Sequence, residues 1–552
     1  MEISLALTVF LLSLTLIYWI SATRSPQIPG PPPHPFVGHT FQVPIVKTWR
    51  YFEKLSLKYG VLRCSFMIVV CFNKLNAGPI VKLTLAGDDM IVLSNPSDAE
   101  ELLGRRSHNY SSRRPLVYAG KYLSKNLRLV LLPYGEALKR QRAAFHQMVQ
   151  PRGLRSVMTG YQTNSCQAVG GYEDMQDTVS LRLLMDLVTT PTDWSHHCAR
   201  FSASLVFKLT YGQQLDDDGK DLASLEDILA TLMKDFYPGA HLVDTFPILD
   251  RLPDFLAPWR AGAQRKHLME AGLYTRLTSE VRTRMGSDLG LECFAARLWD
   301  QQEKMNITPE ELAYIAGSAF TAGTDTTAGT IEWFLMAMVL YPSTMLKAQE
   351  EIDLFFSSDT IPGYSAMNDL PYCFALVKEV FRWAPVAPAG IPHCSDADDV
   401  YNGFTIRKGT MIIPCIWNMH HNEAEFPNSY TFDPERFLKS PNDSPNSLTE
   451  GHYGFGFGRW VSPSALNIAT DFPCRRKCPG QYLAAKTIWI AIVRVLWAFN
   501  IEPCRDASGN VMNPDPDDCT SGTACKPNHF LMNLVPRSAA HVKTIMLGLE
   551  HM

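Results

Sequence analysis

The chain has 552 residues with a net charge of −4, from 51 basic and 55 acidic side chains. This near balance leaves no excess of positive charge for phosphates, so we expect no nucleic-acid partner. The 13 cysteines are odd in number and lack the spacing of a disulfide framework, which indicates a reducing compartment. An apolar content of 46% is sufficient for a large buried core.

The N-terminus begins with an uncharged, Leu- and Ile-rich run from Ile3 to Ile20. Its length suits a membrane span, so residues 1–22 are predicted to form a membrane anchor. Arg24 follows the run, and the positive-inside rule then places the rest of the chain in the cytosol. Residues 23–38 form a stiff, proline-rich hinge. A cleaved secretory signal is the alternative, although no small-residue cleavage site follows the run. Under that alternative, sequons could be glycosylated at Asn109, Asn306 and Asn442.

The remaining sequence, residues 39–552, contains no second linker and is predicted to form a single large domain. Residues 79–93 are β-leaning, and helical patterns dominate from 136 to about 356. The segment 385–458 is rich in Pro, Gly and Asp and is predicted to have mixed structure. One long apolar helix follows near the C-terminus. We therefore predict a mainly α fold with minor β sheets.

A long apolar helix beginning near Glu310 contains the segment Ala322 to Thr327, which brings Asp325 and Thr326 beside a glycine. An acid and a hydroxyl are poor core residues. They suit a kinked groove that binds a small ligand and relays protons. A simple packing or capping role for Thr326 is the alternative.

A second pattern joins Glu379 and Arg382, which are three residues apart and share one helical face. Arg436 lies downstream in a turn-rich segment. One carboxylate holding two guanidinium groups forms a buried, charge-assisted network. The alternative is an ordinary surface ion pair.

Near the C-terminus, Cys478 precedes Pro479, Gly480 and the long apolar helix. The N-terminal end of a helix favours a thiolate, and glycines let a flat ligand approach the backbone. A single thiolate in such a loop is typical of an axial ligand of haem iron. A buried structural cysteine is the alternative for Cys478, and Cys474 offers a rival thiol.

The order and spacing of these motifs resemble the cytochrome P-450 family of haem-thiolate monooxygenases over nearly the whole chain. The resemblance implies the cytochrome P-450 fold and a haem b cofactor whose iron is bound by Cys478. It implies that Asp325 and Thr326 deliver protons during oxygen activation. It also implies a structural triad beneath the haem, formed by Glu379, Arg382 and Arg436.

Other haem contacts are implied by the same resemblance. Propionate contacts are expected from Arg142, His393 and Arg459, and further haem-loop positions are Phe455 and Gly480. Leu138 replaces the tryptophan that the family places before Arg142, so one propionate hydrogen bond is expected to be missing.

The implied reaction inserts one oxygen atom from O2 into a lipophilic small molecule. Electrons would come from NADPH through NADPH-cytochrome P-450 reductase, docking near Lys139, Arg140 and Lys477. The overall sequence resembles fungal members of the family that act in secondary metabolism, with terpenoid or polyketide substrates. An apolar loop from Tyr237 to Leu249 fits a substrate arriving from the bilayer, and an ordinary helix connection with a core-facing Phe is the alternative. The expected location is the endoplasmic reticulum membrane, with one span and the catalytic domain facing the cytosol.

Three segments depart from the family pattern: 61–78, 153–167 and 460–475. Without them the chain has 503 residues. We predict that they are translated introns, because they interrupt otherwise well-matched motifs, and genuine surface insertions are the alternative. The third segment separates Phe455 and Arg459 from Cys478. A non-catalytic chain that binds no haem therefore remains an alternative function. A haem-thiolate isomerase is a third, against which Asp325 and Thr326 argue.

Overall fold

The computed structural model describes residues 28–59, 80–149, 172–215, 220–236, 239–287, 291–438, 447–458 and 476–550. The predicted anchor, the three predicted insertions, Arg459 and Cys474 lie outside these ranges, and so does sequon Asn442. Within the described ranges, no helix combines the length and apolar character needed to cross a membrane.

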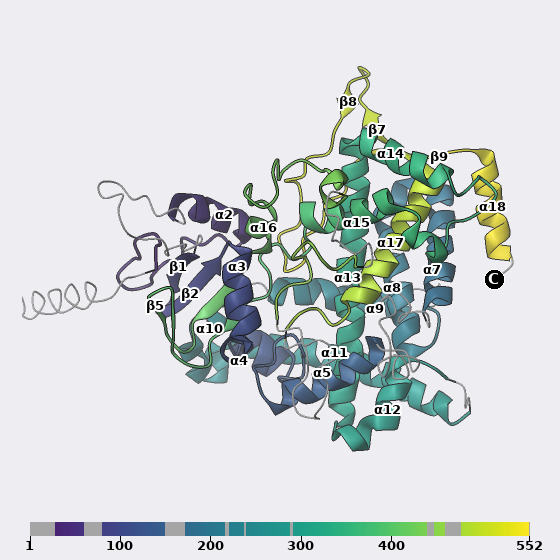
Figure 1. The fold of residues 1–552 in the computed structure, drawn as a ribbon. Coiled ribbons are helices and arrows are strands. Elements are labelled where there is room, and N and C mark those ends of the chain that lie inside the picture. Colours follow the sequence, from purple (N-terminus) through teal and green to yellow (C-terminus); the bar gives the residue numbers. More distant parts are fainter. Residues whose placement is uncertain are drawn as a thin grey trace, which may run out of the picture.

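Helices form most of the described chain (Figure 1). The α-helices are α2 (Thr48–Tyr59), α3 (Pro96–Ala99), α4 (Ser107–Tyr110), α5 (Glu136–Val149), α7 (Glu173–Thr189), α8 (Trp194–Tyr211), α9 (Lys220–Asp235), α10 (Leu242–Thr245), α11 (Pro258–Met285), α12 (Phe294–Met305), α13 (Pro309–Leu340), α14 (Pro342–Asp353), α15 (Pro371–Trp383), α16 (Ile416–His420), α17 (Gln481–Ala498) and α18 (Ala539–Glu550). The short 3₁₀ or π turns are η1 (Glu100–Arg105), η2 (Val117–Leu123), η4 (Pro191–Asp193), η5 (Pro247–Arg251), η6 (Asp254–Leu256), η7 (Tyr364–Asn368) and η8 (Pro434–Phe437).

The described strands form three small sheets. The largest has the order β1-β2-β6-β3, and the others have the orders β4-β5 and β8-β7-β9. Their bounds are β1 (Ile80–Leu85), β2 (Asp88–Leu93), β3 (His393–Cys394), β4 (Asp399–Tyr401), β5 (Phe404–Ile406), β6 (Met411–Pro414), β7 (Phe499–Arg505), β8 (Val511–Met512) and β9 (Met532–Pro536). The predicted β-leaning region forms the antiparallel hairpin β1-β2, and β6 joins β2 in parallel, with Met90 opposite Met411.

Two buried helices, α13 and α17, form the centre of the helical region (Figure 1). Both are apolar nearly all round, as expected for helices packed on every side. The start of α13 is fixed by a capping box between Thr308 and Glu311, with Pro309 in the first helical turn. The largest sheet lies on the opposite side of the molecule from α7 and α18 (Figure 1).

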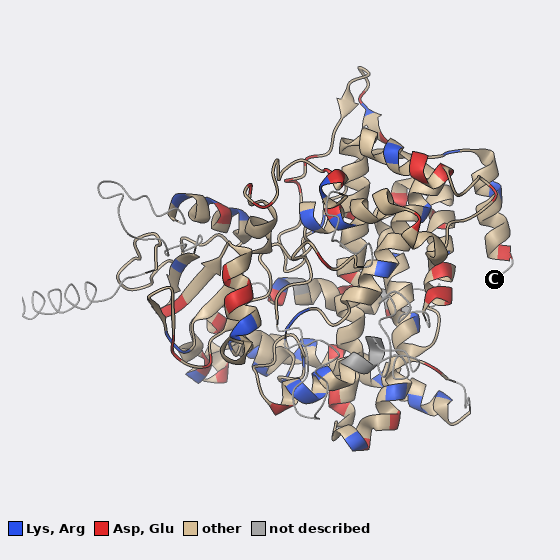
Figure 2. Ribbon diagram, in the orientation of Figure 1, with Lys and Arg blue, Asp and Glu red and all other residues tan. Residues whose placement is uncertain are grey.

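Charged residues of both signs are interspersed along the described ribbon (Figure 2). The helical elements and minor sheets agree with the fold class predicted from the sequence pattern.

Candidate active site

The candidate site begins on α13, where burial is interrupted. From Glu311 to Val339 every residue of this helix is buried except Ala322, Gly323, Asp325 and Thr326. The acid and the hydroxyl singled out by the sequence pattern therefore lie where a small molecule can reach the helix.

The structure assigns α13 as one uninterrupted helix through this segment, and the predicted kink stays a prediction. Two contacts are made at this segment. The Thr326 hydroxyl donates to the Ala322 carbonyl oxygen at 2.7 Å, as a helical threonine can do without breaking the helix. Gly323 allows α8 to pack closely, because a Cβ atom at this position would lie 2.9 Å from Val206 Cγ2.

Asp325 has a cationic neighbour from a distant part of the chain. Lys526 Nζ, in the connection between β8 and β9, lies 3.7 Å from Asp325 Oδ1. Burial raises the pKa of the Asp325 carboxyl, and the charge of Lys526 partly offsets this effect. A carboxyl group in these surroundings can hold and release a proton close to the accessible segment of α13.

The cysteine loop is closed, although its two halves are far apart in sequence. The Cys478 amide donates to the Phe455 carbonyl oxygen at 3.1 Å. A Cβ atom on Gly458 would lie 2.9 Å from Lys477 N and 3.0 Å from Arg476 N, so the two backbones are in contact. Gly480 is the N-cap residue of α17, as the pattern around Cys478 predicts. The backbones of the two halves are therefore in contact, although residues 459–475 separate them in the sequence.

Phe455 connects this loop to α15. Its ring lies 5.1 Å from that of Phe381 and 5.6 Å from that of His452, measured between ring centroids. Phe381 lies between Glu379 and Arg382 in sequence, so α15 supports both the cysteine loop and the predicted triad.

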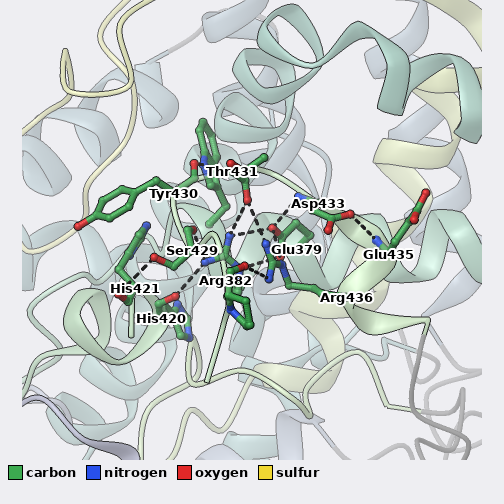
Figure 3. Close-up of polar contacts among 12 residues, drawn as sticks. Glu379, Arg382, His420, His421, Ser429, Tyr430, Thr431, Asp433, Glu435 and Arg436 are labelled. Atoms are coloured by element: carbon green, nitrogen blue, oxygen red, sulfur yellow. Dashed lines mark hydrogen bonds and ion pairs between the residues drawn. The ribbon is translucent and has the colours of Figure 1, made fainter. Parts of the chain in front are cut away.

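The structure brings Glu379, Arg382 and Arg436 together (Figure 3). Arg382 donates through Nε and Nη2 to the two oxygens of Glu379, each at 2.7 Å. Arg436 Nε donates to Glu379 Oε1 at 3.1 Å. The side chains of Glu379 and Arg382 are fully buried, so this is an internal network and not a surface ion pair.

The remaining donors of Arg382 fix the chain that follows α16. Nη1 donates to the carbonyl oxygens of His420 at 2.9 Å and Ser429 at 2.7 Å (Figure 3). Glu379 Oε1 also accepts from the Asp433 amide at 2.8 Å. The network thereby ties α15 to the turn-rich segment through Arg436.

Four nitrogen-bearing side chains form a second group, which we term the cationic cluster: Arg113, Arg142, Arg476 and His393. All are buried or half-buried. They come from four separate parts of the sequence, and backbone carbonyl groups hold each of them.

Two members bind the cysteine loop to its neighbours. Arg142 Nη2, on α5, donates to the Lys477 carbonyl oxygen at 2.9 Å, one residue before the cysteine. Arg476 Nε donates to the Ser111 carbonyl oxygen at 2.6 Å, and its Nη2 donates to that of Leu132 at 2.5 Å.

Of the other two members, His393 belongs to β3 of the largest sheet and Arg113 follows a residue that bridges that strand. Arg113 Nη1 donates to the Ile391 carbonyl oxygen at 2.7 Å and to that of Pro392. His393 Nδ1 lies 2.8 Å from the Tyr110 carbonyl oxygen, which makes Nδ1 the donor. Arg113 Nε is buried and has no hydrogen-bond partner.

The cluster is electrostatically unfavourable without an anion. Burial, followed by the charge of Arg142, lowers the pKa of Arg113 to about 9. Burial and the charges of Arg113 and Arg142 lower the pKa of Arg476 to about 8, with Asp396 opposing them weakly. Burial and Arg113 also hold the pKa of His393 well below its usual value. An anionic ligand at this position would relieve the repulsion.

Sequence reasoning missed two members of this cluster, Arg113 and Arg476. Arg459 was predicted for a propionate contact in this loop, but it lies outside the described residues, and Arg476 is the loop arginine found in the cluster. The sequence signal that could have identified Arg476 was its position two residues before Cys478. Of the predicted reductase-docking residues, Arg140 Nη2 is held by Glu311 at 2.5 Å and Lys139 Nζ by Glu136 at 2.8 Å.

The comparisons with known proteins decide the family. The family model for cytochrome P-450 matches residues 28–532. The chain belongs to the cytochrome P-450 family. It is 30% identical to cytochrome P-450 monooxygenase 58 of Postia placenta, over 100% of this chain and 96% of that protein. It is 31% identical to cytochrome P-450 monooxygenase aneD of Aspergillus aculeatus, over 98% and 93% of the two chains.

A solved structure shares the cytochrome P-450 fold. It is a zebra fish cytochrome P-450 in a structure with abiraterone, with a TM-score of 0.62 and 21% identity. The match covers 84% of this chain and 97% of that chain. The relatives are named monooxygenases, and monooxygenase activity is accordingly the activity of this cytochrome P-450.

Family membership implies a haem cofactor, and the described residues fit one. The cationic cluster suits the two propionate groups, and the buried Arg113 Nε is a donor available to them. Cys478 lies just before α17, and the preceding residue, Lys477, is hydrogen-bonded to Arg142 of the cluster. A thiolate ligand and carboxylate-binding arginines are the groups that a haem-thiolate site needs.

Proposed function

We propose that this cytochrome P-450 is a membrane-anchored monooxygenase of fungal secondary metabolism that oxidises a lipophilic small molecule. It would use haem b, with electrons from NADPH through NADPH-cytochrome P-450 reductase. The observation that carries the proposal is the cationic cluster, because it requires an anionic ligand and is hydrogen-bonded to the residue before Cys478.

In this proposal Cys478 would bind the haem iron. Arg142 and His393 hold the propionates, together with Arg113 and Arg476. Phe455 and Gly480 shape the loop around the cysteine, and Arg459 remains a predicted propionate contact. Glu379, Arg382 and Arg436 keep the chain on this side of the haem in place. Haem, when bound, supplies the activation of dioxygen.

Asp325 and Thr326 would deliver protons during oxygen activation. The partly buried Asp325 carboxyl, whose pKa is raised by desolvation, holds a proton more tightly than a fully exposed one. The Thr326 hydroxyl would pass that proton on after leaving the Ala322 carbonyl oxygen, which it contacts in the present structure.

Exposed apolar side chains support a membrane-bound enzyme with a lipophilic substrate. Phe36 and Phe41, in the first described segment, are 90% and 77% exposed. Further exposed apolar residues lie from the start of α10 to just before α11, within and beyond the predicted apolar loop: Leu242, Ile248, Phe255 and Leu256. Clusters of this kind are typical of surfaces that contact lipid. We propose the endoplasmic reticulum membrane as the location, with residues 1–22 as the single span.

A carbon monoxide difference spectrum of the reduced full-length protein tests the proposal. A thiolate-ligated haem gives a strongly red-shifted Soret band, and the protein should then consume NADPH when reductase is added. Absence of that band at full haem supply would contradict the proposal and favour the non-catalytic alternative.

A further inference from the structure

A second carboxylate, Glu332, lies seven residues beyond Asp325 on α13, which is about two helical turns. The Glu332 side chain is fully buried, and its Oε1 accepts a hydrogen bond from Ser195 Oγ on α8 at 3.0 Å. Its other oxygen, Oε2, is buried and has no hydrogen-bond partner. Such a group needs a reason to be kept, because burying a carboxyl without full pairing is costly.

Lys526 is shared between the two carboxylates. Its Nζ lies 3.7 Å from Glu332 Oε1 and 3.7 Å from Asp325 Oδ1. Both distances exceed an ordinary hydrogen bond, so the ammonium group is committed to neither acid. Because the two acids are seven residues apart, they lie on the same face of the helix.

The backbone of the Lys526 loop is fixed against this face. At Gly329, between the two acids, an added Cβ atom would lie 3.2 Å from Lys526 Cβ, so glycine permits the close approach. Trp333 Nε1 donates to the Cys525 carbonyl oxygen at 3.0 Å, and the Cys525 amide donates to Val386 at 2.7 Å. The lysine stem therefore starts from a defined point, and only its flexible end chooses between the acids.

Burial and neighbouring charges together place the ionisation of Glu332 close to neutral pH. Burial raises the pKa of Glu332 to about 7, against the opposing effects of Lys526 and Ser195, and Asp325 raises it further. The nearby Cys198 thiol on α8 is buried and has a raised pKa, so it adds no negative charge. Both acids in turn raise the pKa of Lys526, which stays positively charged.

We propose that Glu332 and Lys526 are positioning residues that control Asp325 according to whether Glu332 carries a proton. With a proton on Glu332, the ammonium group of Lys526 moves to Asp325 and holds its carboxylate. When Glu332 releases that proton to water, Lys526 is drawn back toward Glu332, and Asp325 is free to turn toward Thr326. The inference rests on the proton-delivery role proposed for Asp325.

The test measures the product formed per NADPH consumed, on both sides of pH 7, with holoenzyme and reductase. In the wild type this coupling should rise as Glu332 ionises. Glu332→Gln cannot ionise, so its coupling should stay low and lose the pH dependence. Lys526→Met removes the cation that holds Asp325, so its coupling should lose the pH dependence, and Lys526→Arg should restore that dependence because a cation again lies between the acids. Exposed residues supply the matched controls Glu350→Gln on α14 and Lys543→Met on α18.

An infrared titration gives a readout that does not depend on turnover. The wild type should show a protonated-carboxyl band that disappears near pH 7 and is absent from Glu332→Gln. A band that titrates identically in both proteins would overturn the inference, as would an unchanged pH profile of coupling in Glu332→Gln. Should that variant fail to bind haem, the Lys526 variants and the wild-type titration still decide the matter.

Asp325→Asn distinguishes a failure of the role proposed for Asp325 from a failure of the positioning role proposed for Glu332 and Lys526. If it leaves coupling unchanged, the proposed role of Asp325 itself is wrong. If it lowers product formation by about 10²-fold while the Glu332 and Lys526 variants behave as wild type, only the positioning inference fails.

Discussion

Glu379 accepts hydrogen bonds from two arginine side chains and from the Asp433 amide while fully buried. Glu379→Gln keeps the shape of the side chain but removes its charge, which leaves Arg382 buried without a counter-ion. We expect a loss of about 3–5 kcal/mol in the free energy of unfolding, measured by urea denaturation.

The control for this experiment is Glu350→Gln, an exposed position where a change within about 0.5 kcal/mol is expected. Equal stability of the two variants would show that Glu379 does not hold the network together.

Glu332 gives a prediction about stability and pH. In the unfolded chain its carboxyl ionises near pH 4.5, whereas in the folded protein burial delays ionisation to about pH 7. The folded state therefore binds more protons between these values, so the contribution of Glu332 is greatest below about pH 4.5 and is lost as pH rises through 7.

Relative to Glu332→Gln, the wild type should lose about 3 kcal/mol of stability over this interval. Urea denaturation of both proteins at a series of pH values measures the difference. A wild-type curve parallel to that of the variant would contradict the raised pKa.

Cys478 gives a spectroscopic prediction. Cys478→Ala should abolish the red-shifted carbon monoxide band, because it removes the thiolate, while Cys474→Ala should retain it. The reverse result would assign the iron ligand to Cys474 and would require a different register of the loop.

At the scale of elements, the cysteine loop depends on the close approach at Gly458. An added methyl group would meet the backbone nitrogen atoms of Arg476 and Lys477, which cannot move aside as a flexible side chain does. Gly458→Ala should therefore separate the two halves of the loop and lower haem retention after gel filtration, measured as haem per protein.

The matched control is Gly262→Ala on α11, where a Cβ atom meets nothing within 4 Å. Retention of haem by Gly458→Ala at the level of this control would show that the contact between the halves is dispensable.

The elements that the sequence pattern predicted well are those defined by local composition. The helix expected near Glu310 begins at Pro309, and the helix after Gly480 spans Gln481–Ala498, because long apolar runs and terminal prolines and glycines act locally. Glu379 and Arg382 were found by their spacing on one helical turn.

Residues brought together by distant parts of the chain escaped prediction. Arg113 joins Arg476 only because α4 and the strands near His393 pack beside the cysteine loop. Lys526 meets Asp325 across some two hundred residues of sequence. The local periodicity of the sequence carries no information on such contacts, because they depend on tertiary packing.

At the scale of the whole molecule, the three predicted insertions give the remaining prediction. If they are translated introns, the mature transcript lacks them, and the 503-residue chain should bind more haem per protein than the 552-residue chain. Sequencing the transcript and comparing haem content of both purified proteins measure this. A transcript that retains all three segments would make them genuine insertions.

The contact between Gly458 and Arg476 has a practical consequence for protein engineering. The segment 459–475 leaves and re-enters the fold at points whose backbones touch. The entropy of closing a loop between fixed, adjacent ends grows only slowly with its length. This position is therefore a suitable place to splice in a fluorescent reporter or an affinity tag in place of the present segment.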